Sequence, residues 1–306
     1  MPRRVLFHRE FKAFTGGHLK VFDYFNHTLS CDNYLAEIHL TQNSATDHPW
    51  RGKQGVVKDY DPENAEILFV AGMDWTALAA HPGIEERVPV VNLVQGLRHA
   101  SPSNPLFGFL RRRAIRLCVS DQVAQALKAT VLCNGPIHVI PNGIDFGLLP
   151  VSDGIVDCDI FVSGSKQPRL ASDLTARLQE QGYTVDCQIE HLPRSVFLTR
   201  MARTRVVVLL PLPEEGFYLP SLEALAMGLV VICPDCIGNR AFCIDRVTAL
   251  TPPLDLDHLV AAVHEVTRDP LLSKTLRDKG KEISLRHDIR SERETFLNIL
   301  EDIRQA

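Results

Sequence analysis

The segment EEGFYLPSLEALAMG, residues 214–228, places two acids and a glycine before a short apolar stretch that carries a third acid. It follows VVVLLP (206–211), an apolar run with the length and composition of a buried strand. Pro220 suits the first turn of a helix, and Gly228 suits the position that ends one. The segment therefore predicts a strand, a loop and a helix of about two turns, which are parts of a parallel α/β sheet.

Apolar runs of the same kind recur on both sides of this segment. Because apolar and polar residues alternate little in them, they predict strands covered on both faces, as in a parallel sheet. Helix-compatible sequence lies between the runs, for example at residues 18–30, and the tail from about residue 256 is helical with a break near Asp269 and Pro270. The runs are residues 5–8, 34–40, 66–72, 89–95 and 116–120, followed by 159–164, 184–189, 206–211 and 229–234.

The loop IPNGIDFGLLPVSDG (140–154) separates the two series of strands and is rich in proline, glycine and aspartate. A chain of 306 residues also exceeds one average domain. We expect an α/β protein of two Rossmann-like domains, residues 1–147 and 148–306, that face a cleft, with the last helix packing back on the first domain. Ligands of such sheets bind beyond the carboxyl ends of the strands, so the residues that follow strands are the candidates.

Composition excludes several classes of function. The net charge of −4 arises from 33 basic and 37 acidic residues, which gives no basic surplus for a nucleic-acid partner. The sequence has no apolar run long enough to span a membrane and no apolar segment typical of a secretory signal near its start, so we expect a cytoplasmic protein. In that compartment its eight cysteines are expected to be free thiols.

The helix predicted after residue 218 has the chemistry of an anion site. Its first N–H groups lack partners within the helix, and Gly216 lets a ligand approach the backbone, so a diphosphate would fit. Glu215 lies outside this helix and Glu223 about one turn inside it, so the two carboxylates can accept hydrogen bonds from different hydroxyl groups of one ligand. Alternatively, the acids are the solvated start of an ordinary helix.

Together with VIPNGID (139–145), CVSDQVAQAL (118–127) and CPDCIGNRAF (233–242), this segment resembles the E-x7-E motif of GT-B glycosyltransferases of the family 4 type. The resemblance is close over residues 115–245. In the part of the sequence before residue 115, only the order of the predicted strands and helices is similar. It implies the GT-B fold and transfer of a sugar, with retention of configuration, from a nucleotide-diphosphate donor to an acceptor hydroxyl. It also implies that neither a metal nor another cofactor takes part. The matching residues are Glu215, Gly216, Phe217, Leu219, Pro220, Glu223, Ala224, Ala226 and Gly228.

The resemblance also assigns roles on the donor side. Glu215 would contact hydroxyl groups of the donor sugar, and Glu223 would bind the ribose. Phosphate would be held by backbone N–H groups, those of Phe217, Tyr218 and Leu219.

The family places an Arg and a Lys after the first strand of the second domain, where they neutralise the leaving diphosphate. FVSGSKQPRL (161–170) carries Lys166 and Arg169 in shifted positions, and we assign both to this role. The alternative is that they are ordinary surface charges.

The first strand is followed by FTGGHLK (14–20), which resembles the family's glycine-rich loop on the acceptor side. Gly16 and Gly17 permit close approach of a backbone, and His18 either contacts a phosphate or caps the following helix. In NLVQGLRHA (92–100), Gln95 stands where many relatives carry a histidine. His99 lies four residues further on and is either catalytic or structural.

Three other motifs in the sequence have alternative interpretations. CPDC (233–236), with Cys243 beyond it, has the spacing of a zinc or redox site but lacks an evident fourth ligand. DCD (157–159) resembles a metal-binding Asp-x-Asp but precedes its strand, so no metal is expected there. LRRRAIR (110–116) is helical in pattern, and Arg111, Arg112 and Arg113 either contact an anionic membrane or charged acceptor or form a solvated helix face.

The sequence thus predicts a glycosyltransferase whose partners are a nucleotide-sugar donor and a saccharide or lipid-linked acceptor, in polysaccharide or glycolipid assembly. We expect it in the cytoplasm or peripheral to the inner face of the membrane. The alternatives are another GT-B activity, such as a nucleotide-sugar epimerase or hydrolase, and a nonenzymatic nucleotide-sugar binding subunit of a transferase complex.

Overall fold

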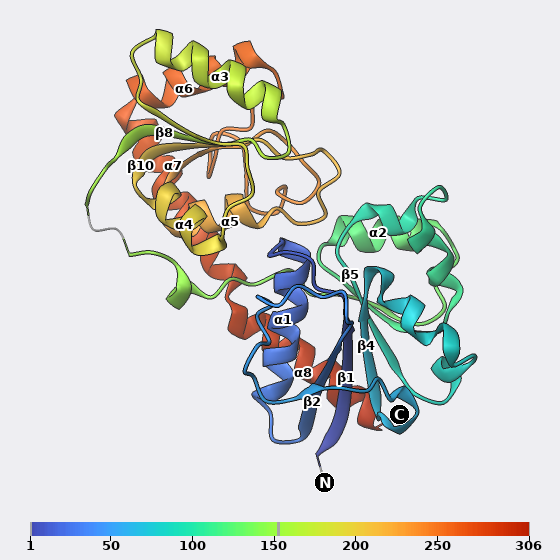
Figure 1. The fold of residues 1–306 in the computed structure, drawn as a ribbon. Helices are drawn as coiled ribbons and strands as arrows, with labels where there is room; N and C mark the ends of the chain where they lie inside the picture. The colour runs from blue at the N-terminus through green and yellow to red at the C-terminus, as the bar shows by residue number, and fades with distance from the viewer. Residues whose placement is uncertain (1, 152–153, 306) are drawn as a thin grey trace. The chain divides into compact units, whose positions relative to one another are not determined.

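The structure is a computed structural model that describes residues 2–151 and 154–305. The chain forms two compact units, which we call unit 1 (Met1–Asn142 and Arg290–Ala306) and unit 2 (Gly143–Ile289). Each unit is built around its own parallel sheet (Figure 1). Of the predicted connecting loop 140–154, residues 152–153 lie outside the described residues.

Unit 1 contains a sheet of seven strands, all parallel, in the order β3-β2-β1-β4-β5-β6-β7. The chain winds from β1 toward β3 on one side and from β4 toward β7 on the other. The direction of winding therefore reverses between β1 and β4. The strands are β1 (Arg3–Arg9), β2 (Tyr34–Leu40), β3 (Val56–Val57), β4 (Ile67–Ala71), β5 (Val90–Val94), β6 (Ile115–Cys118) and β7 (Ile137–Val139).

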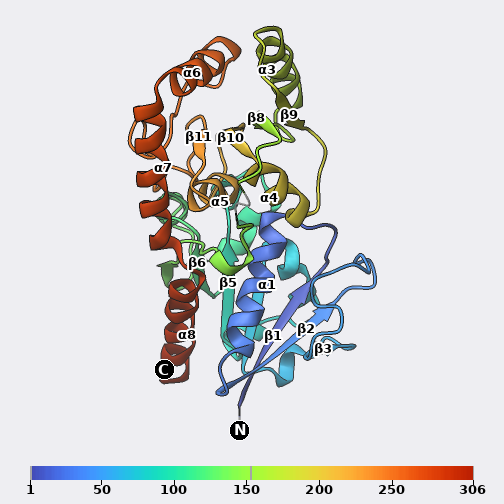
Figure 2. The same ribbon diagram turned by 90° about the vertical axis from the view of Figure 1, so that its left-hand side faces the viewer.

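Aromatic side chains pack two helices on this sheet. Phe7 of β1 meets Phe25 of α1 edge to face, with ring centroids 5.5 Å apart. Phe296 of α8 meets Tyr24 of α1 in the same way at 4.8 Å, so α8, the end of the chain, runs beside α1 (Figure 1, Figure 2). The helices of unit 1 are α1 (Gly16–Leu29), α2 (Asp121–Ala129) and α8 (Ile289–Gln305), the last beginning at the end of unit 2.

Short 3₁₀ helices cover the apolar core on the other face of this sheet. Trp75 and Leu78 of η2 pack with Leu6 of β1 and Val70 of β4 in this core. The helix-compatible sequence after β4 and β5 therefore forms 3₁₀ turns, not α-helices, which makes these connections compact. The 3₁₀ helices of unit 1 are η1 (Pro62–Asn64), η2 (Gly72–Ala80), η3 (Ile84–Glu86), η4 (Leu97–Ala100) and η5 (Pro105–Arg111).

Unit 2 contains four parallel strands in the order β11-β10-β8-β9. From β8 the chain winds to β9 on one side, and from β10 to β11 on the other, so the reversal here lies between β8 and β10. The strands are β8 (Cys158–Ser163), β9 (Val185–Gln188), β10 (Thr204–Leu209) and β11 (Val230–Ile232).

Helices cover both faces of the unit 2 sheet, as its continuous apolar strands predict. Ile160 and Val162 of β8 point into a core shared with α3 and α6, whereas Phe161 between them points into a core shared with α4 and α5 (Figure 1). The helices are α3 (Pro168–Glu180), α4 (Arg194–Ala202), α5 (Leu219–Ala226), α6 (Leu256–Arg268) and α7 (Pro270–Ser284), with 3₁₀ helices η6 (Phe146–Leu148) and η7 (Leu285–His287).

Helix α5 begins and ends as its sequence predicts. Pro220 lies in the first turn. At the other end Gly228 has φ of 71°, and the N–H groups of Gly228 and Leu229 donate to the carbonyl oxygens of Leu225 and Ala224. This is the Schellman pattern, in which glycine takes the left-handed position without steric cost.

The nine strands expected from the apolar runs are confirmed, as is the break between α6 and α7 at Asp269. The sequence did not predict β3 and β7, which have two and three residues and are too short to show a periodicity. The helical pattern expected for residues 110–116 is wrong, because this segment spans the end of η5 and the beginning of β6.

A buried ionic network attaches α8 to α1. Glu292 of α8 is 3% exposed and lies between Lys20, at 2.6 Å, and His27, at 2.9 Å. Lys20 also lies 2.8 Å from Asp23. Burial by itself would raise the pKa of Glu292, but Lys20 and His27 outweigh it and the pKa lies below its usual value. The charge of Glu292 therefore stabilises the folded unit.

We predict that Glu292→Gln lowers the free energy of unfolding of unit 1 by about 3 kcal/mol, since breaking a buried ion pair leaves its partner uncompensated. This value is at the low end of the usual range of about 3–5 kcal/mol for breaking a buried ion pair, because Lys20 still has its ion pair with Asp23 in the variant. Since the folded pKa of Glu292 is depressed, its contribution is present above the unfolded pKa and is lost as the pH falls. Urea denaturation at pH 7 and at pH 4 measures both effects.

Glu294→Gln on the exposed side of α8 is the matched control and should change the stability little. Equal stability of the two variants at pH 7 would contradict the prediction.

Candidate functional site

Two loops of unit 2 meet at the carboxyl edge of its sheet, where the winding direction reverses between β8 and β10. Lys166 follows β8 and Glu215 follows β10, and their side chains form an ion pair although 49 residues separate them. The Glu215 side chain is 18% exposed and that of Lys166 is 40% exposed, so both are accessible to a ligand. Such a reversal is the usual binding position of open α/β sheets.

The N-terminus of α5 lies beside this ion pair. The Lys166 ammonium group lies 5.5 Å from the ring centroid of Tyr218, the residue that precedes α5. Tyr218 itself is buried, 4% exposed. Lys166 and Glu215, predicted separately from the sequence, are therefore brought together next to the predicted anion site.

Glu223 is held by an arginine that sequence reasoning missed. Its Oε1 accepts hydrogen bonds from Nε and Nη2 of Arg194, at 3.1 and 2.5 Å, and the residue is 4% exposed. Arg194 is the first residue of α4 and its side chain is 28% exposed. A buried carboxylate requires a partner, but the sequence analysis did not predict that Glu223 is buried, so nothing in the motif pointed to Arg194.

The backbone at the start of α5 corrects part of the phosphate prediction. The Tyr218 N–H donates to the Gly238 carbonyl oxygen at 3.0 Å, so it is already used inside the protein. Gly216 is buried. Among the described residues, the structure gives no hydrogen-bond partner to the N–H groups of Phe217 and Leu219, which therefore remain candidates for a phosphate.

Gly238 fixes the course of the chain between Glu215 and Phe217. A Cβ atom at position 238 would lie 2.5 Å from the Phe217 nitrogen and 2.7 Å from the Glu215 carbonyl oxygen. Contacts this short do not occur without a shift of the backbone. The loop after β11 can therefore support the Glu215 segment only because residue 238 has no side chain.

Arg169 takes no part in the Lys166–Glu215 ion pair. It is exposed in the first turn of α3, and no hydrogen bond or ion pair joins its side chain to any residue that the structure describes. Its predicted contact with a diphosphate stays a prediction, and the local geometry is equally that of a surface arginine.

Unit 1 has a second polar cluster, again at the point where its winding reverses. Arg9 is the last residue of β1, and Asp74 lies in η2 directly after β4. Nη1 of Arg9 donates to Oδ2 of Asp74 at 2.9 Å, and Nε of Arg9 donates to Nδ1 of His18 at 2.9 Å. His18 is thereby tied to two residues that the sequence did not single out.

The glycine-rich loop and Gln95 belong to the same edge. The Gln95 side chain donates to the Gly17 carbonyl oxygen at 3.1 Å and so links the end of β5 to the first turn of α1. Gly16, an exposed residue, begins that helix, and the preceding Thr15 gives it no side-chain cap. The structure therefore brings Gly16, Gly17, His18 and Gln95 together, and His18 does not act as the cap.

His99 is 3% exposed in η4. Burial, with Arg98 and Arg116 adding to it, lowers the pKa of His99 to about 3. The ring is therefore neutral at pH 7, and its burial favours the structural alternative over a catalytic one.

Cysteine and aspartate motifs show no metal geometry. Cys233, Cys236 and Cys243 are buried free thiols, and Nδ2 of Asn239 lies 3.2 Å from Sγ of Cys233. Burial raises the pKa of Cys236 to about 12, which makes its thiol unreactive. Asp157 and Asp159 lie at the amino end of β8. In residues 2–151 and 154–305 no three His, Cys, Asp or Glu side chains are grouped to hold a metal ion.

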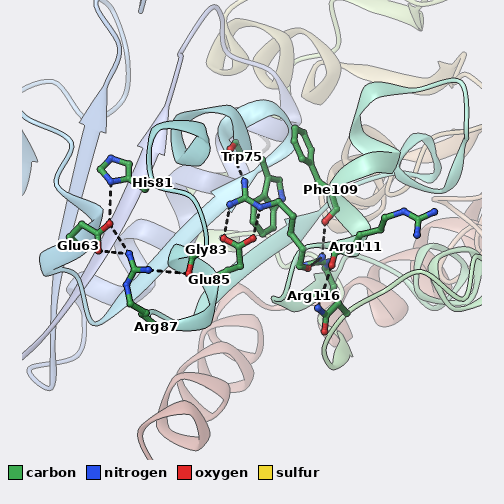
Figure 3. Close-up of polar contacts among 11 residues, drawn as sticks. Glu63, Trp75, His81, Gly83, Glu85, Arg87, Phe109, Arg111 and Arg116 are labelled. Carbon is green, nitrogen blue, oxygen red and sulfur yellow. Dashed lines mark hydrogen bonds and ion pairs between the residues drawn. The ribbon is translucent and has the colours of Figure 1, made fainter.

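The predicted basic cluster is largely neutralised by neighbouring acids. Arg112 makes a two-pronged contact with Glu85, at 2.7 and 2.6 Å, and its guanidinium lies 4.8 Å from the Trp75 ring centroid. Arg113 lies 3.4 Å from Glu86. Figure 3 shows Glu85 beside Trp75, and the buried Arg116, which donates to backbone carbonyls, close by. Membrane contact through Arg111, Arg112 and Arg113 stays a prediction.

A cavity of about 460 Å³ lies at the other edge of the unit 1 sheet. Its walls include Val90 and Ile115, the first residues of β5 and β6, and Ile299 of α8. The cavity lies at the amino ends of these strands, whereas ligands of parallel sheets bind at the carboxyl ends, so it is not the candidate active site.

Among the helices of the described chain, none combines the length and apolar character required to cross a bilayer.

Similarity to solved structures defines the fold of the chain. HepE of Anabaena, in a crystal structure with UDP-glucose, matches with a TM-score of 0.77 at 15% identity, over 98% of this chain and 99% of that one. A sucrose-phosphate synthase of Thermosynechococcus elongatus matches with 0.75 at 13% identity, over 98% and 99%. The trehalose-6-phosphate synthase OtsA matches with 0.67 at 11% identity, over 99% of each chain. The chain thus has the α/β GT-B fold that the sequence predicts.

The sequence itself then points to a family. Residues 131–269 match the model of a family described as Glycosyl transferases group 1. This range includes Lys166, Arg194, Glu215 and Glu223. No curated protein matches the sequence. The family match and the fold together support a glycosyltransferase.

We predict that Gly238→Ala displaces the Glu215 segment and destabilises unit 2 by about 1–3 kcal/mol, as overpacking does. Hydrogen exchange of residues 215–218 and thermal unfolding measure the two effects. In the control Gly108→Ala the new Cβ meets nothing within 4 Å, so no comparable loss is expected. Unchanged exchange in Gly238→Ala would show that the loop does not depend on this contact.

His99 should also give unit 1 a measurable pH dependence. Its folded pKa of about 3 lies below the usual 6.5, so between these values only the unfolded chain takes up the proton. Stability therefore falls as the pH falls, by up to about 1.4 kcal/mol per pH unit. His99→Asn should reduce the difference in unfolding free energy between pH 7 and pH 5 by about 2 kcal/mol.

Denaturant titrations at the two pH values test this, with His191→Asn at an exposed position as the control. If both variants keep the wild-type pH dependence, His99 titrates normally and the interpretation is wrong.

Proposed function

We propose that this protein is a retaining glycosyltransferase that moves a sugar from a nucleotide-diphosphate donor to an acceptor hydroxyl. The observation that carries the proposal is the Lys166–Glu215 ion pair at the start of α5, in the loops where the unit 2 sheet reverses. It places a cation suited to a diphosphate and a carboxylate suited to sugar hydroxyls within one contact distance of each other.

In this proposal unit 2 binds the donor. Lys166 and the free N–H groups at the start of α5 neutralise the charge that develops on the leaving diphosphate. Glu215 orients the donor sugar, while Glu223 accepts hydrogen bonds from ribose hydroxyls and is held in place by its hydrogen bonds from Arg194. Because HepE was crystallised with UDP-glucose, a uridine nucleotide is the first donor to test.

The finer parts of the proposal come from the family resemblance. They are membership of the family 4 type, transfer without a metal or other cofactor, and polysaccharide or glycolipid assembly on a saccharide or lipid-linked acceptor. A cytoplasmic site of action, with contact to the inner face of a membrane, belongs to the same proposal.

Two substitutions test the site. Glu215→Gln and Lys166→Met should each lower kcat/KM for transfer at least about 100-fold, because each removes a charge that acts on the reacting group. Glu214→Gln is the matched control: Glu214 is exposed, and no described residue forms a hydrogen bond or ion pair with its side chain, so its activity should remain within about twofold.

The double variant Lys166→Met/Glu215→Gln separates a substrate role from a purely structural one. If the two residues only neutralise each other, removing both should restore wild-type activity. If both contact the donor, the double variant should be no better than the poorer single variant.

Calorimetry with UDP-, GDP-, ADP- and dTDP-sugars first establishes whether a donor binds. Binding of none of them would contradict the proposal. Binding with no transfer to any acceptor would favour a nonenzymatic subunit, and release of free sugar or its epimer would favour a hydrolase or epimerase.

A further inference from the structure

A chain of hydrogen bonds runs from Asp74 through Arg9 to His18 at the carboxyl edge of unit 1. Oδ2 of Asp74 accepts from Nη1 of Arg9 at 2.9 Å and from the Ala71 N–H at 3.0 Å. Nη1 of Arg9 also donates to the Ala71 carbonyl oxygen at 3.0 Å, and its Nε donates to Nδ1 of His18 at 2.9 Å. The guanidinium is thus held on both sides, with its Nε directed at one atom of the histidine ring.

The chemistry of the two groups determines where the histidine carries its proton. A guanidinium group has N–H donors and no acceptor. Nδ1 of His18 must therefore be the acceptor in this bond, which leaves the single proton of a neutral ring on Nε2. A protonated ring would instead direct an N–H at the N–H of Arg9.

The surroundings of His18 favour the same state. Burial lowers the pKa of His18 to about 4, with Arg9 and Lys12 adding to the effect and Asp74 opposing it. The ring lies in the first turn of α1, where the positive end of the helix dipole disfavours a cation. Phe11 packs against the ring with centroids 5.0 Å apart. The ring is neutral at pH 7.

His18 lies at the edge of the sheet where ligands of parallel sheets bind. His18 is only partly buried, and it follows the exposed Gly16 in the loop after β1, next to the reversal between β1 and β4. Asp74, by contrast, is 6% exposed and turned toward Arg9. The polar group that the Asp74–Arg9–His18 series presents to a ligand is therefore an N–H donor and not a carboxylate or a cation.

We infer that Arg9 and Asp74 are positioning residues that hold His18 as a neutral Nε2–H donor for a substrate oxygen. His18 then binds that oxygen through a hydrogen bond and takes no part as a general base or as a positive charge. The state of the ring follows from unit 1 alone, whereas the identity of the oxygen, in a phosphate or in a sugar hydroxyl, rests on the proposed function.

Nuclear magnetic resonance of the ¹⁵N-labelled full chain tests the state of the ring without any turnover. Long-range ¹H–¹⁵N spectra distinguish the two neutral tautomers and the cation, and His18→Gln assigns the signal. We expect the Nε2–H tautomer from pH 5.5 to 8. The Nδ1–H tautomer or a cation at pH 7 would overturn the inference, whether or not the protein transfers sugar.

Arg9→Lys tests the positioning role. Lysine keeps the positive charge beside Asp74 but lacks the fork that reaches both Asp74 and His18, so the tautomer preference should be lost and the His18 pKa should rise. Arg51→Met, at an exposed arginine of the same unit, is the control. Wild-type His18 signals in a folded Arg9→Lys variant would contradict the positioning role, and Asp74→Asn provides a second variant if Arg9→Lys does not fold.

Transfer kinetics test the role of the donor. Glutamine at position 18 keeps an N–H donor at the end of the side chain, whereas leucine has none. We expect His18→Leu to lower kcat/KM about tenfold, as for the loss of one neutral hydrogen bond, and His18→Gln to retain more activity than His18→Leu. Equal loss in both variants would indicate a base or a cation and overturn the inference.

Titrations with inorganic phosphate, UDP-glucose and glucose identify the oxygen. A shift of the His18 Nε2 signal with phosphate and UDP-glucose alone assigns a phosphate oxygen, and a shift with glucose assigns a sugar hydroxyl. If none of the three moves the signal at saturating UDP-glucose, His18 does not contact substrate and the ligand role is wrong.

Discussion

Both units depend on the same constraint, which is the geometry of a parallel sheet whose winding reverses between two neighbouring strands. At the reversal the connections after β1 and β4, and those after β8 and β10, leave the sheet toward opposite faces, so polar side chains from two connections can meet at its carboxyl edge. Two polar clusters, Arg9 with Asp74 and Lys166 with Glu215, lie at these two points. The strand order therefore determines where chemistry is possible before any side chain is considered.

The strands and the last helices could be predicted because their evidence is local. Apolar runs and the Pro220 and Gly228 signals depend on neighbours in sequence, and the structure places elements where they indicated. The partners of the site residues are not local. Arg194 reaches Glu223 across 29 residues and Arg9 reaches Asp74 across 65, and neither arginine lies in a recognisable motif. Such contacts depend on strand order and register, which a single sequence does not specify.

For the acids of the site, burial determines how firmly each carboxylate is held by a cation, and motif spacing does not. Glu215 and Glu214 are adjacent and chemically identical, yet only Glu215 turns toward a cation. Glu223 is buried and so needs Arg194, whereas the Lys166–Glu215 pair is partly exposed and is held more weakly, because solvent screens it. A ligand can therefore replace the contact between Lys166 and Glu215 at low cost, while the Arg194–Glu223 contact behaves as part of the scaffold.

The two clusters also differ in the charge that they offer. In unit 1 the positive charge of Arg9 lies between Asp74 and His18, and it is balanced by a carboxylate that is almost inaccessible. In unit 2 the ammonium group of Lys166 is exposed enough to leave Glu215 for a stronger anion. Under the proposed function, a diphosphate carries more negative charge than a carboxylate and draws the cation of unit 2, whereas the neutral donor inferred for unit 1 binds an oxygen without adding charge to it. In that proposal, the electrostatic contribution to a departing diphosphate therefore comes mainly from unit 2.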